Sequence, residues 1–241
     1  SNVYALQFTR NESWYGSVLG MDGKIYCVPR TSNTGTHSVL VIDPVTDTLN
    51  FYDTGIAGGT NNWNCGVLGT NAKIYCCPRA SSNVLIINPL TSPPTFTTLD
   101  KLPPGEYRSG ALAPNGNIYM VPTSGTNVLK IVPGAVPSRS LIGIGTTSFW
   151  GAALSPDGYI YFIPNGGNPI NNSVYRFNPA NETASLYFTF TSTSDIAYLG
   201  GVLTPYNTIV ACPFREGRVM EFGVNLPSLP SWMIQAYFNK L

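Results

Sequence analysis

The sequence predicts an all-β protein, a five-bladed β-propeller in which each blade is a four-stranded antiparallel sheet. Two observations carry this prediction. First, one pattern recurs five times: an aromatic residue, one or two small residues, an apolar pair ending in Leu, a tight turn, and a second apolar segment ending in Pro. Second, most copies contain four short strand-like segments. The copies begin at Trp14, Trp63, Tyr107, Phe149 and Tyr198, so their starts lie 49, 44, 42 and 49 residues apart. Such a period is typical of propeller blades.

The segments of each repeat follow one another in a constant order. The first repeat reads WYGSVL, IYCVP, SVLVIDP and LNFY, and the second reads WNCGVL, IYCCP, NVLIINP and TFTTL. The third contains YRSGAL, NIYMVP, NVLKIVP and a weak fourth segment near Leu141, and the fourth contains FWGAAL, YIYFIP, SVYRFNP and SLYFTF. The fifth contains only YLGGVL, TIVACP and RVMEFGV. A β-sandwich of regularly spaced strands would not explain a repeat that returns with its aromatic, Leu and Pro in order.

The two ends of the chain complete this architecture. Residues Val3 to Phe8 alternate as a strand does, and we expect them to close the ring as the outer strand that blade five lacks. After a Pro-broken linker, residues 231–241 read as a short helix with Ser231 as its N-cap. We expect its apolar stripe, which includes Trp232 and Tyr237, to brace the propeller rather than to bind a partner. Residues 1–241 therefore form one domain.

Turn chemistry supports the strand pairs. Asp22-Gly23, Asn115-Gly116 and Asp157-Gly158 occupy the same turn of three repeats. Gly adopts the positive φ that tight hairpin turns require.

Two segments carry a resemblance to known repeats. The stretches LSPDGYIYF at Leu154 to Phe162 and LAPNGNIYM at Leu112 to Met120 resemble the blades of NHL and YVTN-type propeller repeats. The resemblance covers all five repeats and implies a propeller blade without implying an activity. The chain lacks the Trp-Asp ending of WD repeats and the Asp box of sialidases. Tachylectin-like lectins are also five-bladed and bind sugars, which gives an analogy at the level of the fold.

Composition narrows the functional classes. Charged residues make up only 10% of the chain and the net charge is +1, with no cluster of Lys and Arg in the sequence, so nucleic acid binding is disfavoured. No run of eighteen apolar residues predicts a membrane span. A neutral surface rich in Asn, Ser, Thr and Gly favours an extracellular or particle-surface location, with a neutral cytosolic propeller as the alternative. The chain begins with Ser1 rather than Met, which is compatible with removal of an earlier segment.

The sequence does not favour an enzyme. The five inner segments contain no Asp or Glu, whereas glycosidases need a pair of carboxylates at the channel. His37 is the only histidine, and we expect it in a solvated loop without a nucleophile elbow. We predict no metal site and no cofactor, because Cys76 and Cys77 are adjacent on one strand and point to opposite faces. Cys27 could pair with Cys77 or with Cys212, and free buried thiols are the favoured alternative.

What remains is binding. We expect a non-catalytic module that recognises a carbohydrate or protein ligand on the face around the channel mouth. The alternatives are a structural subunit of an assembly, with self-association, and a glycoside hydrolase-like enzyme. Aromatic rings beside Arg or Asn suit ligand recognition, although the aromatics could equally be wedges between blades. The candidate ligand-binding residues are Trp14, Arg30, Trp63, Arg79, Tyr107, Arg108, Trp150, Asn165 and Tyr198. The candidate glycosylation sites are Asn11, Asn171 and Asn181, and several such sequons would arise by chance in this composition.

Overall fold

A computed structural model describes residues 11–33, 35–102, 105–146, 148–165, 172–191, 198–214 and 217–224. These residues form five antiparallel sheets, four of them four-stranded and one three-stranded. The prediction of an all-β, five-bladed propeller is confirmed. No helix occurs among these residues, and so none that could cross a membrane. The predicted closing strand at Val3 to Phe8 and the predicted helix at 231–241 lie outside the described residues.

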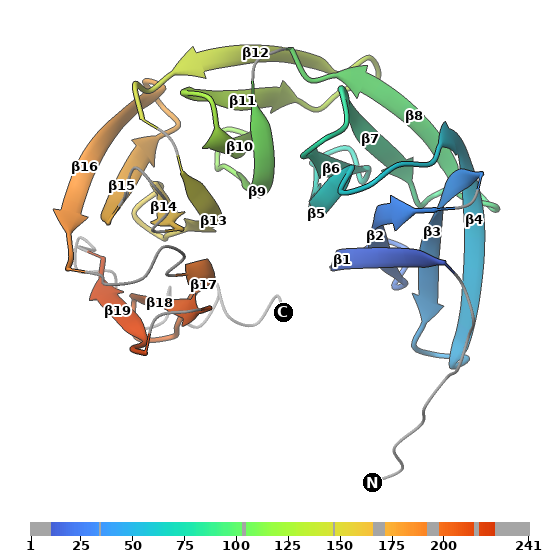
Figure 1. The fold of residues 1–241 in the computed structure, drawn as a ribbon, viewed down its shortest axis with the longest axis horizontal. Helices are drawn as coiled ribbons and strands as arrows, with labels where there is room; N and C mark the ends of the chain where they lie inside the picture. Colours follow the sequence, from blue (N-terminus) through green and yellow to red (C-terminus); the bar gives the residue numbers. More distant parts are fainter. Residues whose placement is uncertain are drawn as a thin grey trace, which may run out of the picture.

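Each blade is a meander whose strands follow one another from the inside to the outside of the molecule (Figure 1). Blade 1 consists of β1 (Glu12–Leu19), β2 (Ile25–Ser32), β3 (Thr36–Asp43) and β4 (Thr48–Ala57). Blade 2 consists of β5 (Trp63–Leu68), β6 (Ile74–Pro78), β7 (Asn83–Asn88) and β8 (Thr95–Asp100). Blade 3 consists of β9 (Glu106–Leu112), β10 (Ile118–Ser124), β11 (Asn127–Val132) and β12 (Ser138–Gly143). Blade 4 consists of β13 (Phe149–Leu154), β14 (Ile160–Pro164), β15 (Ser173–Asn178) and β16 (Thr183–Thr189). Blade 5 consists of β17 (Tyr198–Leu203), β18 (Thr208–Pro213) and β19 (Met220–Gly223).

The described blades form an arc around a central channel. The inner strands β1, β5, β9, β13 and β17 contact one another in chain order. No comparably extensive contact joins β17 to β1 within the described part of the chain, and Figure 1 shows an opening between blades 1 and 5. The core is therefore divided among the places where consecutive blades face each other.

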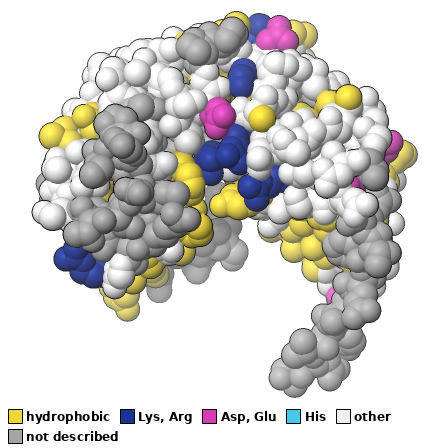
Figure 2. Space-filling model, in the orientation of Figure 1, with side chains coloured by type: hydrophobic (Ala, Val, Ile, Leu, Met, Phe, Trp, Pro, Cys, Tyr) yellow, Lys and Arg dark blue, Asp and Glu magenta, His cyan; other side chains and the backbone are white. Residues whose placement is uncertain are grey.

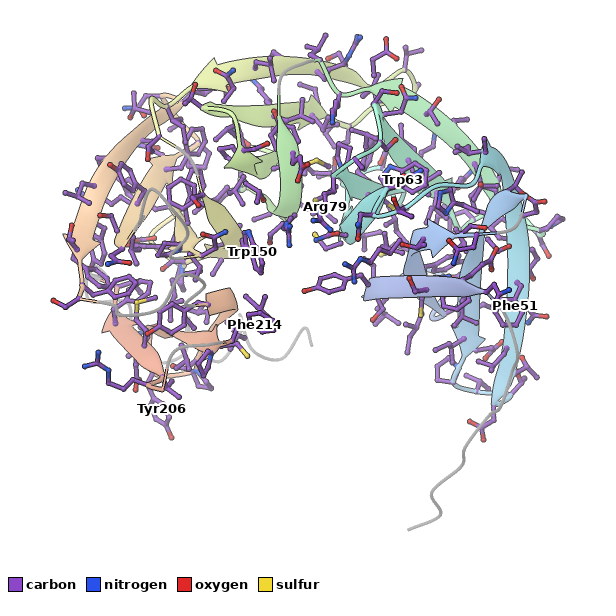
Figure 3. All side chains as sticks on the ribbon, in the orientation of Figure 1. Phe51, Trp63, Arg79, Trp150, Tyr206 and Phe214 are labelled. Carbon is purple, nitrogen blue, oxygen red and sulfur yellow. The ribbon has the colours of Figure 1, made fainter. Side chains whose placement is uncertain are left out.

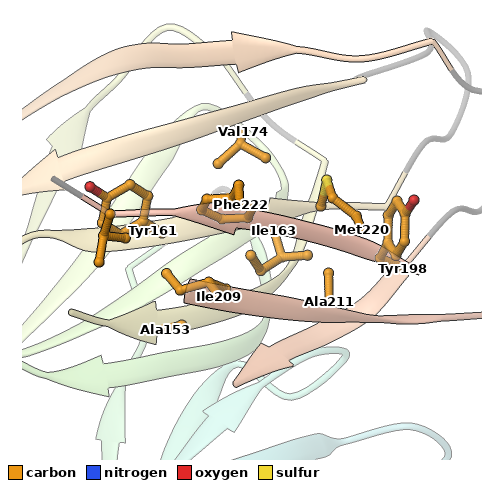
Figure 4. Packing of buried hydrophobic residues seen from close by; sticks show 10 residues of the cluster. Ala153, Tyr161, Ile163, Val174, Tyr198, Ile209, Ala211, Met220 and Phe222 are labelled. Carbon is orange, nitrogen blue, oxygen red and sulfur yellow. The ribbon is translucent and has the colours of Figure 1, made fainter. Parts of the chain in front are cut away.

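Four apolar clusters fill these places, one between each pair of consecutive blades. The cluster between blades 4 and 5 brings Tyr161 and Ile163 against Ile209, Ala211 and Phe222 (Figure 4). Side chains alternate along each strand, so one set meets the preceding blade and the other set meets the following blade. Each blade thus needs a neighbour on both sides to bury its apolar residues.

A tyrosine on the second strand ties back to the preceding turn in blades 1 to 4. Tyr26 and Tyr161 each donate a hydrogen bond of 2.8 Å from the hydroxyl to the carboxylate of the turn residue, Asp22 or Asp157. In blades 2 and 3 the turn residue is Asn, and its amide donates to the tyrosine hydroxyl at 3.0 Å. Burial is the largest cause of the raised pKa of Tyr26 and of Tyr161, and the neighbouring carboxylate raises both further. Blade 5 has Val210 at this position and so lacks the tie.

Every inner strand is irregular immediately after its opening aromatic. The aromatic pairs with the closing Pro of the second strand, as Phe149 does with Pro164, and the register then shifts before the next pair. Proline has no N–H to donate to the neighbouring strand, so regular pairing ends there and a bulge forms. In blade 4 the bulge leaves Trp150 without a partner between Phe149 and Gly151. In each blade, this bulge turns one side chain toward the channel.

Candidate site at the central channel

The bulges build a small cavity on the channel. Its volume is about 140 Å³, and all five inner strands contribute to it. The residues that line it are Tyr15, Gly16, Asn64, Cys65, Arg108, Ser109, Trp150 and Leu199. Five of these directly follow the opening aromatic of their repeat: Tyr15, Asn64, Arg108, Trp150 and Leu199.

A cation stacked on an aromatic ring dominates the cavity. The guanidinium carbon of Arg108 lies 4.0 Å from the centre of the Trp150 ring. This is a close cation–π contact, which places the positive charge over the face of a rigid apolar ring. The Trp150 ring also lies near Phe214, with 6.4 Å between ring centres and 48° between ring planes. Side chains from blades 3, 4 and 5 therefore meet around Trp150.

Two further arginines lie beside Arg108. The Arg79 Nε is 3.5 Å from the carboxylate of Glu106, and the Arg30 Nε donates to the Asn61 side-chain oxygen at 2.8 Å. Figure 2 shows Lys and Arg side chains gathered on this concave part of the molecule, and Figure 3 places Arg79 and Trp150 on either side of it. The three arginines carry three positive charges, and Glu106 opposes them with one negative charge, so positive charge is in excess at this place.

The environment of Arg108 disfavours its positive charge. The pKa of Arg108 is lowered to about 10, mainly by burial and also by the charges of Arg79 and Arg30, against the opposing effect of Glu106. The guanidinium stays protonated at neutral pH, but its charge is only partly compensated. A negatively charged group in the cavity would remove this imbalance.

Several buried polar atoms of the site have no hydrogen-bond partner in the part of the chain that the structure describes. They are the Nε of Arg108, the indole nitrogen of Trp150 and the side-chain oxygen of Asn64. A buried polar atom without a hydrogen bond costs free energy, and such atoms concentrate where a ligand or water supplies the bond. A second hollow, of about 290 Å³, lies between blades 1 and 2. Polar side chains near it have partners in the protein, since Tyr26 donates a hydrogen bond to Asp22 and Lys24 pairs with Asp43.

The structure separates the predicted ligand-binding residues into three groups. Arg108 and Trp150 line the cavity, and Arg30 and Arg79 flank it. Trp63, Tyr107 and Tyr198 are buried in the clusters between blades, and Trp14 is partly buried.

Hydrogen bonds fix the predicted residues Trp14, Trp63 and Asn165, which do not line the cavity. The indole nitrogens of Trp14 and Trp63 donate to the carbonyls of Ser38 and Asn83 at 2.9 and 2.8 Å, so both rings are fastened within their own blades. Asn165 is buried, and its side-chain oxygen accepts from Ser148 at 2.8 Å, which ties two loops together.

Sequence reasoning missed Tyr15, Asn64, Cys65 and Glu106. It treated the opening aromatic as the exposed residue, whereas the next residue turns to the channel. Variation among the repeats carried a signal, because the position after the aromatic is Tyr, Asn, Arg, Trp or Leu while the aromatic itself is kept. The statement that the inner segments lack carboxylates also needs correction, because β1 and β9 begin one or two residues earlier than expected, at Glu12 and Glu106.

His37 is not a solvated loop residue as expected. It is fully buried against Trp63, with 5.1 Å between ring centres, and its Nε2 lies 2.8 Å from the Asn62 amide nitrogen. Burial lowers the pKa of His37. The expectation failed because β3 begins at Thr36, one residue before the histidine, which draws it into the interface with blade 2.

All five cysteines are free thiols. This agrees with the favoured expectation of free thiols, and neither possible pairing of Cys27, with Cys77 or with Cys212, occurs. The Sγ atoms of Cys65 and Cys77 lie 3.3 Å apart across the bulge of blade 2. In the described ranges, no three His, Cys, Asp or Glu side chains gather as metal ligands would. Asn11 and Asn181 are exposed, and Asn171 lies outside the described residues.

Comparisons with known proteins identify the fold but no family. No family description matches the chain, and no curated protein sequence matches it. A virginiamycin B lyase from Staphylococcus aureus is similar in structure with a TM-score of 0.65 and 14% identity, over 92% of this chain and 73% of the lyase. A periplasmic gluconolactonase from Pseudomonas aeruginosa gives a TM-score of 0.66 and 11% identity, over 88% of this chain and 66% of that enzyme. A fungal alcohol oxidase in complex with copper gives a TM-score of 0.60 and 15% identity, over 86% of this chain and 49% of the oxidase.

These similarities contradict the expectation of a non-catalytic binding module. These three similar structures carry the names of enzymes, so the propeller with a low-charge surface does not by itself indicate a non-catalytic function. At 11 to 15% identity the likeness shows the fold alone. Any activity of this chain must be argued from its own channel residues.

Proposed function

We propose that the protein is an enzyme that acts in the channel cavity on a small carboxylic ester or lactone, with Arg108 as the partner of the developing oxyanion and Glu106 as the proton acceptor. One observation carries the proposal. The Arg108 guanidinium is half-buried, lies over the Trp150 ring, and has a buried Nε with no hydrogen-bond acceptor among the described residues. Donors fixed in advance at the place where negative charge develops are the largest source of rate enhancement in many enzymes.

The charge of the site supports an oxyanion rather than a cation as the group that it stabilises. Arg79 and Arg30 both depress the pKa of Arg108, which means that their fields reach the same point. A carbonyl oxygen that becomes negative there is stabilised by three positive charges in surroundings that are partly shielded from water. A neutral sugar would leave this charge uncompensated.

The size of the cavity limits the reacting group. A volume of about 140 Å³ corresponds to about four or five water molecules at their share of the liquid volume. An ester or small lactone ring fits such a space, and Trp150 and Tyr15 offer apolar surface beside it. The rest of a larger substrate would extend into the channel.

The proposed reaction is hydrolysis. Glu106 accepts a proton from a water molecule, whose oxygen adds to the substrate carbonyl, and the resulting oxyanion forms beside Arg108. Collapse of this intermediate breaks the bond to the alcohol oxygen, which takes the proton from Glu106 as it leaves. The products are an alcohol and a carboxylic acid, joined in one molecule when the substrate is a lactone. Glu106 lies beside the cavity lining, with its carboxylate 3.5 Å from the Arg79 Nε, and its charge acts on Arg108.

The comparisons give limited support. The gluconolactonase is named for a lactone, and the virginiamycin B lyase is named as a lyase. Both names are compatible with a channel in which negative charge on oxygen is stabilised, and they assign nothing to this chain. We also propose that the repeats are of the NHL or YVTN type, on the evidence of the Leu-x-Pro-Asx-Gly turns at Leu112 and Leu154.

The test is a screen for ring opening and ester hydrolysis by acid release in a pH-stat, using a panel of aliphatic lactones and aryl esters. For a substrate that is turned over, we expect Arg108→Gln to lower kcat/KM by about 100- to 1000-fold, which is the usual effect of removing one oxyanion partner. Glu106→Gln should lower kcat comparably.

The matched control is Arg139→Gln. Arg139 is on the outer strand β12, where it pairs with Asp100 at 3.2 Å, and its loss should leave kcat/KM unchanged. A panel with no turnover, or equal rates for the Arg108 and Arg139 variants, would rule out the proposal.

A further inference from the structure

Two thiols face each other beside the channel cavity. Cys65 is on the inner strand β5 and Cys77 is on its neighbour β6, and the Cys65 thiol donates to the Cys77 sulfur with 3.3 Å between the Sγ atoms. Both residues lie at the register shift that forms the bulge of blade 2. A disulfide requires the sulfur atoms to approach to about 2.05 Å, so rotation of the two side chains brings them most of the way.

The other blades show that these two positions lie opposite each other across the strands. Ser109 pairs directly with Val121 in blade 3, and Gly151 pairs directly with Ile163 in blade 4. The Cβ atoms of such directly opposed residues are about 4.5 to 5.5 Å apart, and those of a disulfide are about 3.5 to 4.5 Å apart. Blade 2 is the one repeat that has Cys at both positions. A cross-link there is compatible with the fold of the blade.

The two thiols have different access to small molecules. Cys65 is partly buried and lines the cavity, whereas Cys77 is fully buried in the cluster between blades 2 and 3. Burial raises the pKa of Cys77, which keeps it in the thiol form. Cys76 belongs to the cluster between blades 1 and 2 and so points away from both. A small oxidant in the cavity therefore meets Cys65 first, and Cys77 is the thiol that stands next to it.

We propose that Cys65 and Cys77 form an oxidation site, in which a hydroperoxide that enters the channel cavity oxidises Cys65 and Cys77 converts the product to a disulfide. This inference is independent of the proposed hydrolysis, because neither cysteine takes part in that reaction. The disulfide joins β5 to β6 at the bulge and draws the Cys65 side chain out of the cavity wall. The oxidation state of one pair of residues thus changes the lining of the channel.

The reaction has two steps. In the first, the Cys65 sulfur attacks a peroxide oxygen, the O–O bond breaks, and Cys65 becomes a sulfenic acid, while the other oxygen takes the thiol proton and leaves as water or an alcohol. In the second, the Cys77 sulfur attacks the Cys65 sulfur, the S–O bond breaks, and the oxygen leaves as water with the Cys77 proton. The two sulfur atoms together lose two electrons, and these reduce the peroxide.

The test is oxidation of the folded Cys212→Ser chain by hydrogen peroxide, because this substitution removes the exposed thiol, which would otherwise join two chains. Remaining thiols are blocked with N-ethylmaleimide, and tryptic peptides are analysed by mass spectrometry without reduction. Trypsin cleaves after Lys73 and Arg79, so Cys65 and Cys77 fall in separate peptides. We expect one dominant cross-link between these peptides, lighter than their sum by two hydrogen atoms and released by dithiothreitol.

Two variants in the same background assign the bond, because the peptide Ile74–Arg79 also contains Cys76. Cys77→Val introduces the residue that blades 1 and 3 have at this position. It should lower the cross-linked fraction about tenfold or more and leave Cys65 to accumulate as sulfinic acid. Cys76→Ala is the matched control, with the residue of blade 5 at its position, and should leave the cross-link unchanged.

Three results would overturn the proposal. The first is the absence of the cross-link from the oxidised Cys212→Ser chain, with Cys65 still a thiol or oxidised further. The second is a cross-link that survives in Cys77→Val or disappears in Cys76→Ala. The third is a cross-link that forms equally fast in concentrated urea, because the folded register of β5 and β6 would then have no part in it.

Discussion

Blades 2 and 5 are built from the same repeat but have different surroundings. In blade 2, all five residues of Ile74–Pro78 are buried, because blades 1 and 3 cover both faces. In blade 5, Ile209 and Ala211 are buried against blade 4, while Cys212 on the opposite face is exposed. The repeat therefore determines which face a side chain occupies, and the neighbouring blade determines whether that face is buried.

The largest expected effect is on the free energy of unfolding, when the equivalent isoleucine is replaced separately in blade 2 and in blade 1. Ile74 is fully buried between blades 1 and 2, whereas Ile25 holds the equivalent position in blade 1 and is only partly buried. Ile74→Ala should lower the free energy of unfolding by about 2 to 5 kcal/mol, because it leaves a cavity in a packed core. Ile25→Ala should cost clearly less. Urea unfolding of both variants measures the difference, and equal costs would mean that blade 1 is covered as fully as blade 2.

An intermediate effect is expected from alkaline pH. The pKa values of Tyr26 and Tyr161 are raised in the folded state above the ordinary value of 10.0. A raised pKa contributes stability below the unfolded pKa, and this contribution is lost as pH rises, because the unfolded chain ionises first.

Thermal unfolding measured between pH 8 and pH 11 should therefore show the melting temperature falling above about pH 10. Tyr161→Phe should make this fall shallower. Val210→Ala is the control in blade 5, where no tyrosine occupies the position, and it should leave the slope unchanged. The same slope in the wild type and in Tyr161→Phe would contradict the conclusion that ionisation of Tyr161 causes part of the loss of stability.

The smallest expected effect is a gain in stability at the channel. Arg108 is half-buried with a depressed pKa, and its Nε has no hydrogen-bond acceptor in the described ranges, so its charge is poorly accommodated there. Arg108→Met keeps a long side chain on Trp150 without the charge and should raise the unfolding free energy by up to about 1 kcal/mol, as is common when a functional group is removed. A loss of stability would indicate that the contact with Trp150 outweighs the burial of charge.

The sequence was sufficient for the blades because the repeat combines three independent signals. The aromatic, the turn and the closing Pro placed strands such as β5 and β14 within a residue or two of their observed bounds. The cavity was beyond the same reasoning, because it depends on bulges that change which of two consecutive residues faces the channel. Arg108 and Trp150 were among the predicted residues, whereas Tyr15 and Asn64 at the same position were not.

The sequence also did not predict which polar side chains are buried between two blades. His37 stands in a polar stretch that reads as a loop, yet the packing of Trp63 from blade 2 encloses it. Local sequence describes the blade that contains a residue and says little about the side chain that arrives from the next blade.

The sequential contact of the inner strands has a consequence for how the protein unfolds. Each of the four clusters belongs to two blades, so stability among the described residues is a sum over neighbouring pairs, as in linear repeat arrays. In such an array the terminal units fray before the middle ones. Backbone amides of β10 and β14 should accordingly exchange with deuterium more slowly than those of β2 and β18, although all four strands occupy the same place in their repeats.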